Sequence, residues 1–194
     1  MENILKLSED GKELLEVLDK NVNEIVIPQG IEIIGKGAFR ECKSLTKIKI
    51  PDTIIAINEY AFSGCSALQD INIPSRVTFI GDEVFYNCET LSNINVASDN
   101  TCYSSIDGVL FSKDLKHLIR YTTKANLTRY NIPNGVEFIE KGAFCGCSTL
   151  SCIDIPNSVK SIGDSAFRGC STLSCIDIPN SVTSIGNSAF RGCI

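Results

Sequence analysis

Apolar and polar residues alternate along this chain in short stretches that recur through most of its length. In the stretch 45–50, apolar side chains stand at Leu45, Ile48 and Ile50, with polar residues between them. A period of two is typical of a strand with one buried face. Pro51 follows and ends the strand, because proline cannot donate to a ladder of hydrogen bonds. The same alternation precedes proline over residues 68–74, 150–156 and 173–179.

The spacing of these stretches is regular. The prolines are separated by 23, 23, 59, 23 and 23 residues, at Pro28, Pro51, Pro74, Pro133, Pro156 and Pro179. Around them runs one phrase, Leu-x-x-Ile-x-Ile-Pro-x-x-Val-x-x-Ile-Gly-x-x-Ala-Phe-x-x-Cys, and residues 147–170 and 170–193 are nearly identical. One such unit cannot bury its own apolar face, so the units are expected to stack and their strands to form a parallel sheet.

The second half of each repeat is predicted to return the chain along the opposite face and fill the core. In one repeat these residues are Val159, Ile162, Ala166 and Phe167. The residue before the repeated cysteine is expected to have a left-handed backbone, which glycine adopts most easily. These positions are Gly64, Asn87, Gly146, Gly169 and Gly192.

The phrase Ile-Pro-Asn-Ser-Val-Lys-Ser-Ile-Gly-Asp-Ser-Ala-Phe-Arg-Gly-Cys at 155–170 resembles the BspA-like class of leucine-rich repeats, and the resemblance covers residues 22–194. It implies an α/β-type repeat that is mostly β: a leucine-rich-repeat solenoid with a parallel β-sheet, about seven turns of 23 residues, and few or very short helices. Members of the class are commonly surface or secreted proteins of bacteria or protists, implicated in adhesion and host contact. The resemblance therefore implies a protein–protein interaction or adhesion module at the cell surface.

Two segments depart from the repeat. Val109–Ser112 and His117–Tyr121 are short apolar runs around a polar turn, which predicts a β-hairpin. The N-terminus has a similar arrangement, which favours a hairpin there over the helix that Glu13–Lys20 alone also fits. The predicted organisation is one continuous solenoid domain: a capping hairpin over 1–21, repeats over 22–98, a hairpin-like insertion over 99–126, and repeats over 127–194.

Composition narrows the classes of partner. The 194 residues carry a net charge of −5, from 18 basic and 23 acidic residues. Nucleic acid requires a concentrated basic surface, so it is not expected as a partner. No apolar run reaches the length of a membrane span, so membrane insertion is not expected either. Residues 1–10 lack the cationic and apolar regions of a secretory signal, which makes a cytoplasmic location the alternative to the cell surface.

The ten cysteines fall into two groups. Six occupy the same repeat position and predict a buried, reduced ladder, because free cysteine packs as a small apolar side chain: Cys42, Cys65, Cys88, Cys147, Cys170 and Cys193. The other four are Cys102, Cys145, Cys152 and Cys175. Strand alternation points Cys152 and Cys175 out of the sheet, one above the other, as a thiol pair able to oxidise. Zinc needs about four converging ligands, and Cys145, Cys147 and Cys152 do not supply them, so no metal or other cofactor is predicted.

Catalytic chemistry is not indicated. His117, the only histidine, lies near Asp114 in sequence, but a lone histidine in a hairpin is more often a surface residue. No glycine-rich phosphate loop and no converging carboxylate pair are present. Asn126-Leu-Thr128 is a formal glycosylation sequon. The chain is therefore predicted not to be an enzyme.

The outward strand positions before each proline form two predicted columns on the exposed face of the sheet. One contains Val26, Lys49, Asn72, Asn95, Asn131, Asp154 and Asp177; the other contains Glu24, Lys47, Asp70, Asn93, Arg129, Cys152 and Cys175. Interface hot spots favour aromatic residues, which the columns lack and the insertion supplies. The candidate partner-binding residues are Lys47, Lys49, Asp70, Asn72, Asn93, Asn95, Arg129, Asn131, Asp154, Asp177, Tyr103, Phe111 and Tyr121.

Three hypotheses for function follow. The first is a non-catalytic macromolecule-binding scaffold, whose ligand is a protein or, as the alternative, a glycan. The second is a structural spacer of repeats within a longer chain, with self-association through the terminal edge of the sheet, because an open strand edge can pair with another chain. The third is a protein with thiol redox or metal-binding chemistry.

Overall fold

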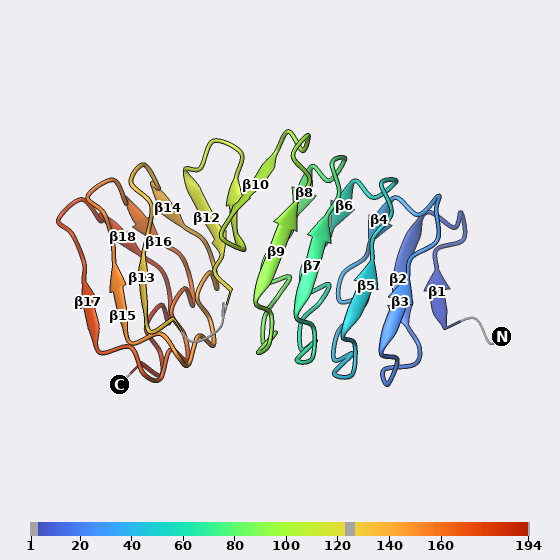
Figure 1. Ribbon diagram of the computed structural model, residues 1–194, viewed down its shortest axis with the longest axis horizontal. Coiled ribbons are helices and arrows are strands. Elements are labelled where there is room, and N and C mark those ends of the chain that lie inside the picture. The colour runs from blue at the N-terminus through green and yellow to red at the C-terminus, as the bar shows by residue number, and fades with distance from the viewer. Residues whose placement is uncertain (1–3, 123–126, 194) are drawn as a thin grey trace. The chain divides into compact units, whose positions relative to one another are not determined.

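The computed structural model describes residues 4–122 and 127–193 (Figure 1), and these are strands and turns with no helix among them. The predicted mostly-β leucine-rich-repeat solenoid with parallel sheets and about seven turns is confirmed. The chain divides into two compact units, residues 1–103 and 104–194.

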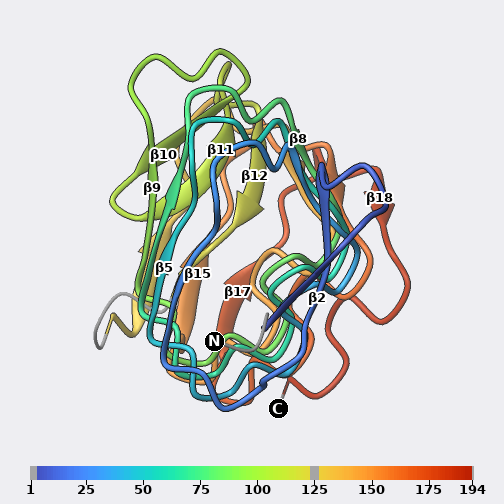
Figure 2. The same ribbon diagram turned by 90° about the vertical axis from the view of Figure 1, so that its right-hand side faces the viewer.

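The first unit contains two kinds of ladder, both of them parallel from one repeat to the next. The sheet that holds the two-residue strands of the repeats has the order β1 (Leu5–Leu7), β2 (Glu13–Val17), β4 (Ile33–Ile34), β6 (Ala56–Ile57) and β8 (Phe79–Ile80), with β1 and β2 antiparallel. The longer strands pair as β3 (Glu24–Val26) with β5 (Lys47–Lys49), and as β7 (Asp70–Ile73) with β9 (Asn93–Val96). The two kinds of strand lie on opposite sides of this unit, with the core between them (Figure 2).

The second unit repeats this plan. Its larger sheet has the order β10 (Tyr103–Ile106), β11 (Val109–Ser112), β12 (His117–Arg120), β14 (Phe138–Ile139), β16 (Ser161–Ile162) and β18 (Ser184–Ile185). Its smaller sheet is β13 (Arg129–Asn131), β15 (Cys152–Asp154) and β17 (Cys175–Asp177), all parallel. The longer strands are those expected from the alternating pattern, whereas the two-residue strands were not expected.

A hairpin with the same turn precedes the repeats of each unit. In the first, Ser8 Oγ donates to Asp10 Oδ1 at 2.6 Å and accepts from the Glu13 N–H at 2.9 Å. In the second, Ser112 Oγ donates to Asp114 Oδ1 at 2.6 Å, and the His117 N–H takes the place of Glu13. The last strand of each hairpin, β2 or β12, then pairs in parallel with the first short strand of the repeats. The segment that begins at Glu13 is therefore a strand and not a helix.

Aromatic rings and thiols form the core of each turn. Phe62 stacks on Phe39 and Phe85, with ring centroids 4.8 and 5.8 Å apart. The thiol of Cys65 donates to the carbonyl oxygen of Phe39 at 3.1 Å. The same thiol–carbonyl bond recurs one turn later and twice in the second unit, from Cys88, Cys170 and Cys193. The cysteine ladder therefore satisfies a carbonyl of the preceding turn as well as filling space.

Two positions of the repeat have a left-handed backbone in one repeat after another. The expected set before the cysteine has φ between 55° and 80°, and Glu41 joins it at 61°. A second set, four residues earlier, was not expected: Gly37, Tyr60, Glu83, Gly142, Ser165 and Ser188, with φ between 51° and 65°. Non-glycine residues rarely adopt this conformation, so the stacked turns must hold them in it.

The buried thiols should resist modification in the folded protein. Burial raises the pKa of Cys147 from its ordinary value of 9.0 to about 11, so little nucleophilic thiolate forms at pH 8. We expect iodoacetamide at pH 8 to alkylate Cys102 and to leave Cys65, Cys147 and Cys170 unmodified until denaturant is added, as measured by peptide mass spectrometry. Equal labelling rates for Cys65 and Cys102 in native protein would contradict the buried ladder. Because the folded pKa of Cys147 is the higher one, the stability that this thiol contributes is present below pH 9 and is lost as the pH rises towards 11.

Candidate partner-binding surfaces

The two predicted columns lie on the exposed face of the longer strands of the first unit. Lys47 is in register with Glu24, and Lys49 with Val26. All of these side chains are exposed. The ammonium group of Lys47 lies 3.9 Å from the Glu24 carboxylate, a long ion pair between exposed groups. Lys49 forms no ion pair with another residue in the described ranges.

Asparagine side chains connect the columns in the next two strands. Asp70 is in register with Asn93, and Asn72 with Asn95. The amide of Asn95 donates to Asn72 Oδ1 at 3.1 Å, and the amide of Asn93 donates to Asn95 Oδ1 at 3.1 Å. These bonds orient the amides, and Asp70, Asn72 and Asn95 remain exposed while Asn93 is half-buried.

In the second unit the columns carry opposite charges. Arg129 makes a bidentate ion pair with Asp154, with nitrogen–oxygen distances of 2.8–3.0 Å. Asn131, Asp154 and Asp177 are in register across the three strands. Since Arg129 already pairs with Asp154, Asp177 provides the less compensated negative charge on this face.

Two of the three candidate aromatic residues of the insertion are buried. Phe111 is 0% exposed and Tyr121 3% exposed, and burial raises the pKa of Tyr121 to about 12. Tyr103 is half-buried, and its hydroxyl accepts a hydrogen bond from the Ile80 N–H at 2.9 Å. Phe111 and Tyr121 therefore contribute to the core, whereas Tyr103 keeps part of its ring exposed and stays a candidate contact. Asn126 of the sequon lies outside the described residues.

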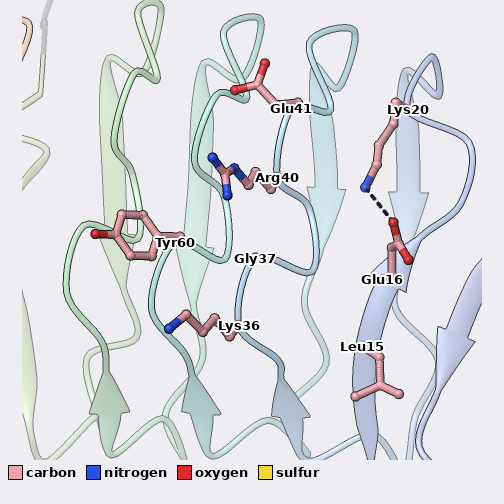
Figure 3. Close-up of a pocket in the computed structure, with 8 residues that line it drawn as sticks. All are labelled: Leu15, Glu16, Lys20, Lys36, Gly37, Arg40, Glu41 and Tyr60. Atoms are coloured by element: carbon pink, nitrogen blue, oxygen red, sulfur yellow. Dashed lines mark ion pairs between the residues drawn. The ribbon is translucent and has the colours of Figure 1, made fainter.

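A hollow that the sequence did not indicate lies on the first unit (Figure 3). It has a volume of about 500 Å³ and is lined by Leu15, Glu16, Lys20, Lys36, Gly37, Arg40, Glu41 and Tyr60. Glu16 forms an ion pair with Lys20 at 3.7 Å. Lys36 and Arg40 are exposed, and neither forms an ion pair with another residue in the described part of the chain. With Glu41, the lining holds three basic and two acidic side chains, an excess of one positive charge.

Tyr60 is the one aromatic side chain in this lining. A hydrogen bond to the Glu83 carboxylate, together with burial, raises the pKa of the Tyr60 hydroxyl. The signal that could have identified it is a departure from the repeat. Tyr60 stands where four other repeats have glycine or serine, although its φ of 57° disfavours a large side chain.

The histidine that the sequence placed near Asp114 pairs with a different carboxylate. His117 Nδ1 lies 2.6 Å from Glu140 Oε1, and the imidazole stacks on Phe138 with centroids 4.6 Å apart. The Asp114 carboxylate instead accepts from Ser112 and from the Lys116 N–H. No group of three potential metal ligands is found in residues 4–122 and 127–193. Over the same residues, no helix could cross a bilayer.

Repeats that bury a continuous core between two ladders define a leucine-rich-repeat solenoid protein. The model of the BspA type leucine rich repeat region matches six copies in this chain, over residues 18–120 and 120–194. The chain therefore belongs to the BspA-type leucine-rich repeat family.

Three solved structures are similar to this chain. A leucine-rich cell surface protein from Faecalibacterium prausnitzii is 34% identical with a TM-score of 0.74, over 90% of this chain and 52% of that protein. The pneumococcal vaccine antigen PcpA is 26% identical with a TM-score of 0.83, over 89% and 49%. A leucine-rich repeat protein from T. pallidum is 26% identical with a TM-score of 0.61, over 100% and 88%. The chain thus spans about half the length of the first two, and no curated protein matches it.

Proposed function

We propose that this chain is a non-catalytic scaffold that binds a protein partner, as an adhesion-type module at a cell surface. The observation that carries the proposal is the exposed face of the longer strands. Its side chains repeat every 23 residues in fixed register, and they take no part in the core. A face of this kind offers a partner many small polar contacts at fixed spacing, as the extended surfaces of other solenoids do.

The comparisons support the surface location. The structure from Faecalibacterium prausnitzii is described as a cell surface protein, and PcpA as a vaccine antigen. Those descriptions belong to the relatives, and the proposal extends them to this chain.

The charged residues of the exposed faces indicate which surface charge the proposed partner would carry. Lys47 and Lys49 lie side by side on the exposed face of the first unit, where they would attract an acidic protein surface and speed its association. The hollow beside Tyr60 and Arg40 offers residue types that dominate interface energies. On the second unit, Asp177 would favour a basic contact.

Reversing the charge of the lysine pair is expected to weaken partner binding at least about tenfold, which corresponds to about 1.4 kcal/mol. The variant is Lys47→Glu/Lys49→Glu. The matched control, Lys6→Glu/Arg76→Glu, makes the same change in net charge at two exposed positions of the first unit outside the columns. Partners would first be captured on the immobilised chain from bacterial and host cell-surface extracts, and their Kd values measured with each variant at low and moderate salt.

Equal affinity of the two variants for every captured partner would remove the lysine face from the proposal. If the folded chain captures no partner from any extract, the chain is better described as spacer repeats. That alternative fits a chain that spans about half the length of two of the solved structures it resembles.

A further inference from the structure

Two of the ten cysteines differ from the rest in position and partner. Cys152 in β15 and Cys175 in β17 are in register on neighbouring parallel strands, with Cα atoms 4.5 Å apart, and their sulfur atoms are joined as a disulfide. Cys175 is exposed and Cys152 half-buried, on the outward face of the sheet. The bond arises because two nearly identical repeats place cysteine at the same outward position.

The remaining cysteines are poorly placed for this chemistry. Cys65 and Cys170 are buried and donate their thiols to backbone carbonyls. Burial raises the pKa of each of these thiols, which suppresses the reactive thiolate. Cys193 is half-exposed, but it makes the same bond to the Phe167 carbonyl. Cys102 is half-exposed, its sulfur lies 3.8 Å from the Thr101 hydroxyl, and it is not joined to a second cysteine.

We propose that Cys152 and Cys175 form a reversible thiol–disulfide site that exchanges with low-molecular-weight thiols and disulfides of the glutathione class. This site goes beyond the proposed scaffold function, and its test needs no protein partner. Exposure at Cys175 admits the small molecule, and the neighbouring sulfur of Cys152 completes the exchange.

The exchange balances in two steps. The Cys175 thiolate attacks one sulfur of the oxidised small molecule, whose S–S bond breaks and releases one small thiolate. The Cys152 thiolate then attacks Cys175 Sγ in the mixed disulfide, forms the Cys152–Cys175 bond and releases the second small thiolate. Two protein thiols are oxidised, one small disulfide is reduced to two thiols, and the protons of the protein thiols pass to the released thiolates or to buffer.

Exchange would change the outward face of the second unit. The disulfide closes a segment with a sequence separation of 23 and ties β17 to β15 outside the hydrogen-bonded ladder. Reduction frees two thiols in the column that also contains Arg129, the neighbour of Cys152 in register. The covalent state of this column would therefore follow the redox balance of the surroundings.

The test uses the folded chain, fully reduced and then equilibrated with mixtures of reduced and oxidised glutathione. Acid quenching, alkylation and peptide mass spectrometry identify each cysteine's state. We expect the Cys152–Cys175 linkage to form as the oxidised fraction rises and to disappear as it falls, while Cys65 and Cys170 remain thiols. The proposal is overturned if Cys152 and Cys175 both stay alkylatable throughout, or if the bond once formed is not reversed by reduced glutathione.

Two single variants test which cysteines form the linkage. Cys152→Ser should abolish the linkage and trap glutathione on Cys175, whereas Cys102→Ser should leave the linkage and its midpoint unchanged. A loss of linkage in Cys102→Ser would contradict the assignment. Far-UV circular dichroism of the reduced proteins checks their folding, and the wild-type titration decides the question if Cys152→Ser does not fold.

Discussion

Truncation of Phe62 to alanine is expected to lower the free energy of unfolding by about 3–5 kcal/mol, the range for deleting a buried phenylalanine side chain. Phe62 is 0% exposed and lies between the rings of Phe39 and Phe85. The cavity cannot close easily, because backbone hydrogen bonds fix the turns on both sides. The Phe62 N–H donates to the Val84 carbonyl at 3.0 Å, and the Phe39 N–H donates to the Ala61 carbonyl at 2.8 Å. Urea unfolding followed by far-UV circular dichroism measures the loss.

The matched control is Phe79→Ala in the same unit. Phe79 lies in β8 and is 47% exposed, so its truncation should cost about 1 kcal/mol or less, since little apolar area returns to water. Similar losses for Phe62→Ala and Phe79→Ala would show that the aromatic stack does not stabilise the unit. Hydrogen exchange should also increase most in the turns adjacent to Phe62, because a repeat depends on its immediate neighbours.

The repeated elements could be predicted from the sequence because each repeat position keeps the same kind of residue, buried or exposed in the same way. Alternation in Ile48 and Ile50 specifies a longer strand with one buried face, and the 23-residue spacing specifies its register with the next. The second ladder could not be predicted in this way. A strand such as Ala56–Ile57 has two residues, which is too short to show a period.

The insertion shows why two aromatic residues, predicted to lie on the surface, are buried in the structure. An insertion was expected to lie outside the stack, so Phe111 and Tyr121 were assigned to the surface. In the structure, β12 pairs in parallel with β14, which makes the hairpin part of the ladder. Val109, Leu110 and Phe111 are then buried in succession, at 2%, 0% and 0% exposed, so alternation no longer separates core from surface. The hollow beside Tyr60 was missed for a different reason: it depends on one departure from the repeat and not on the repeat itself.

Asn100 marks the place where the chain leaves the repeat, and Asn100→Ala is expected to lower the free energy of unfolding by roughly 2–4 kcal/mol because it leaves several buried polar groups without partners. The side chain is 1% exposed. Its amide donates to the carbonyls of Pro74 and Val77 at 2.8 and 3.0 Å, and its oxygen accepts from the N–H groups of Cys102 and Tyr103 at 2.9 and 2.8 Å. Thermal and urea unfolding of the variant measure the effect.

Position explains why an asparagine is needed here. Asn100 follows Val77 by 23 residues, so it occupies the site where the preceding turn has an aliphatic core residue. An aliphatic side chain there could fill the space but could not hold the N–H groups of Cys102 and Tyr103, which lead the chain into β10. Asn100→Val should therefore destabilise the protein despite restoring the repeat, whereas Asn95→Ala, which removes an exposed amide, should have little effect. If Asn100→Val is as stable as the natural chain, the four hydrogen bonds are not what fixes the exit from the repeat, and packing alone must do so.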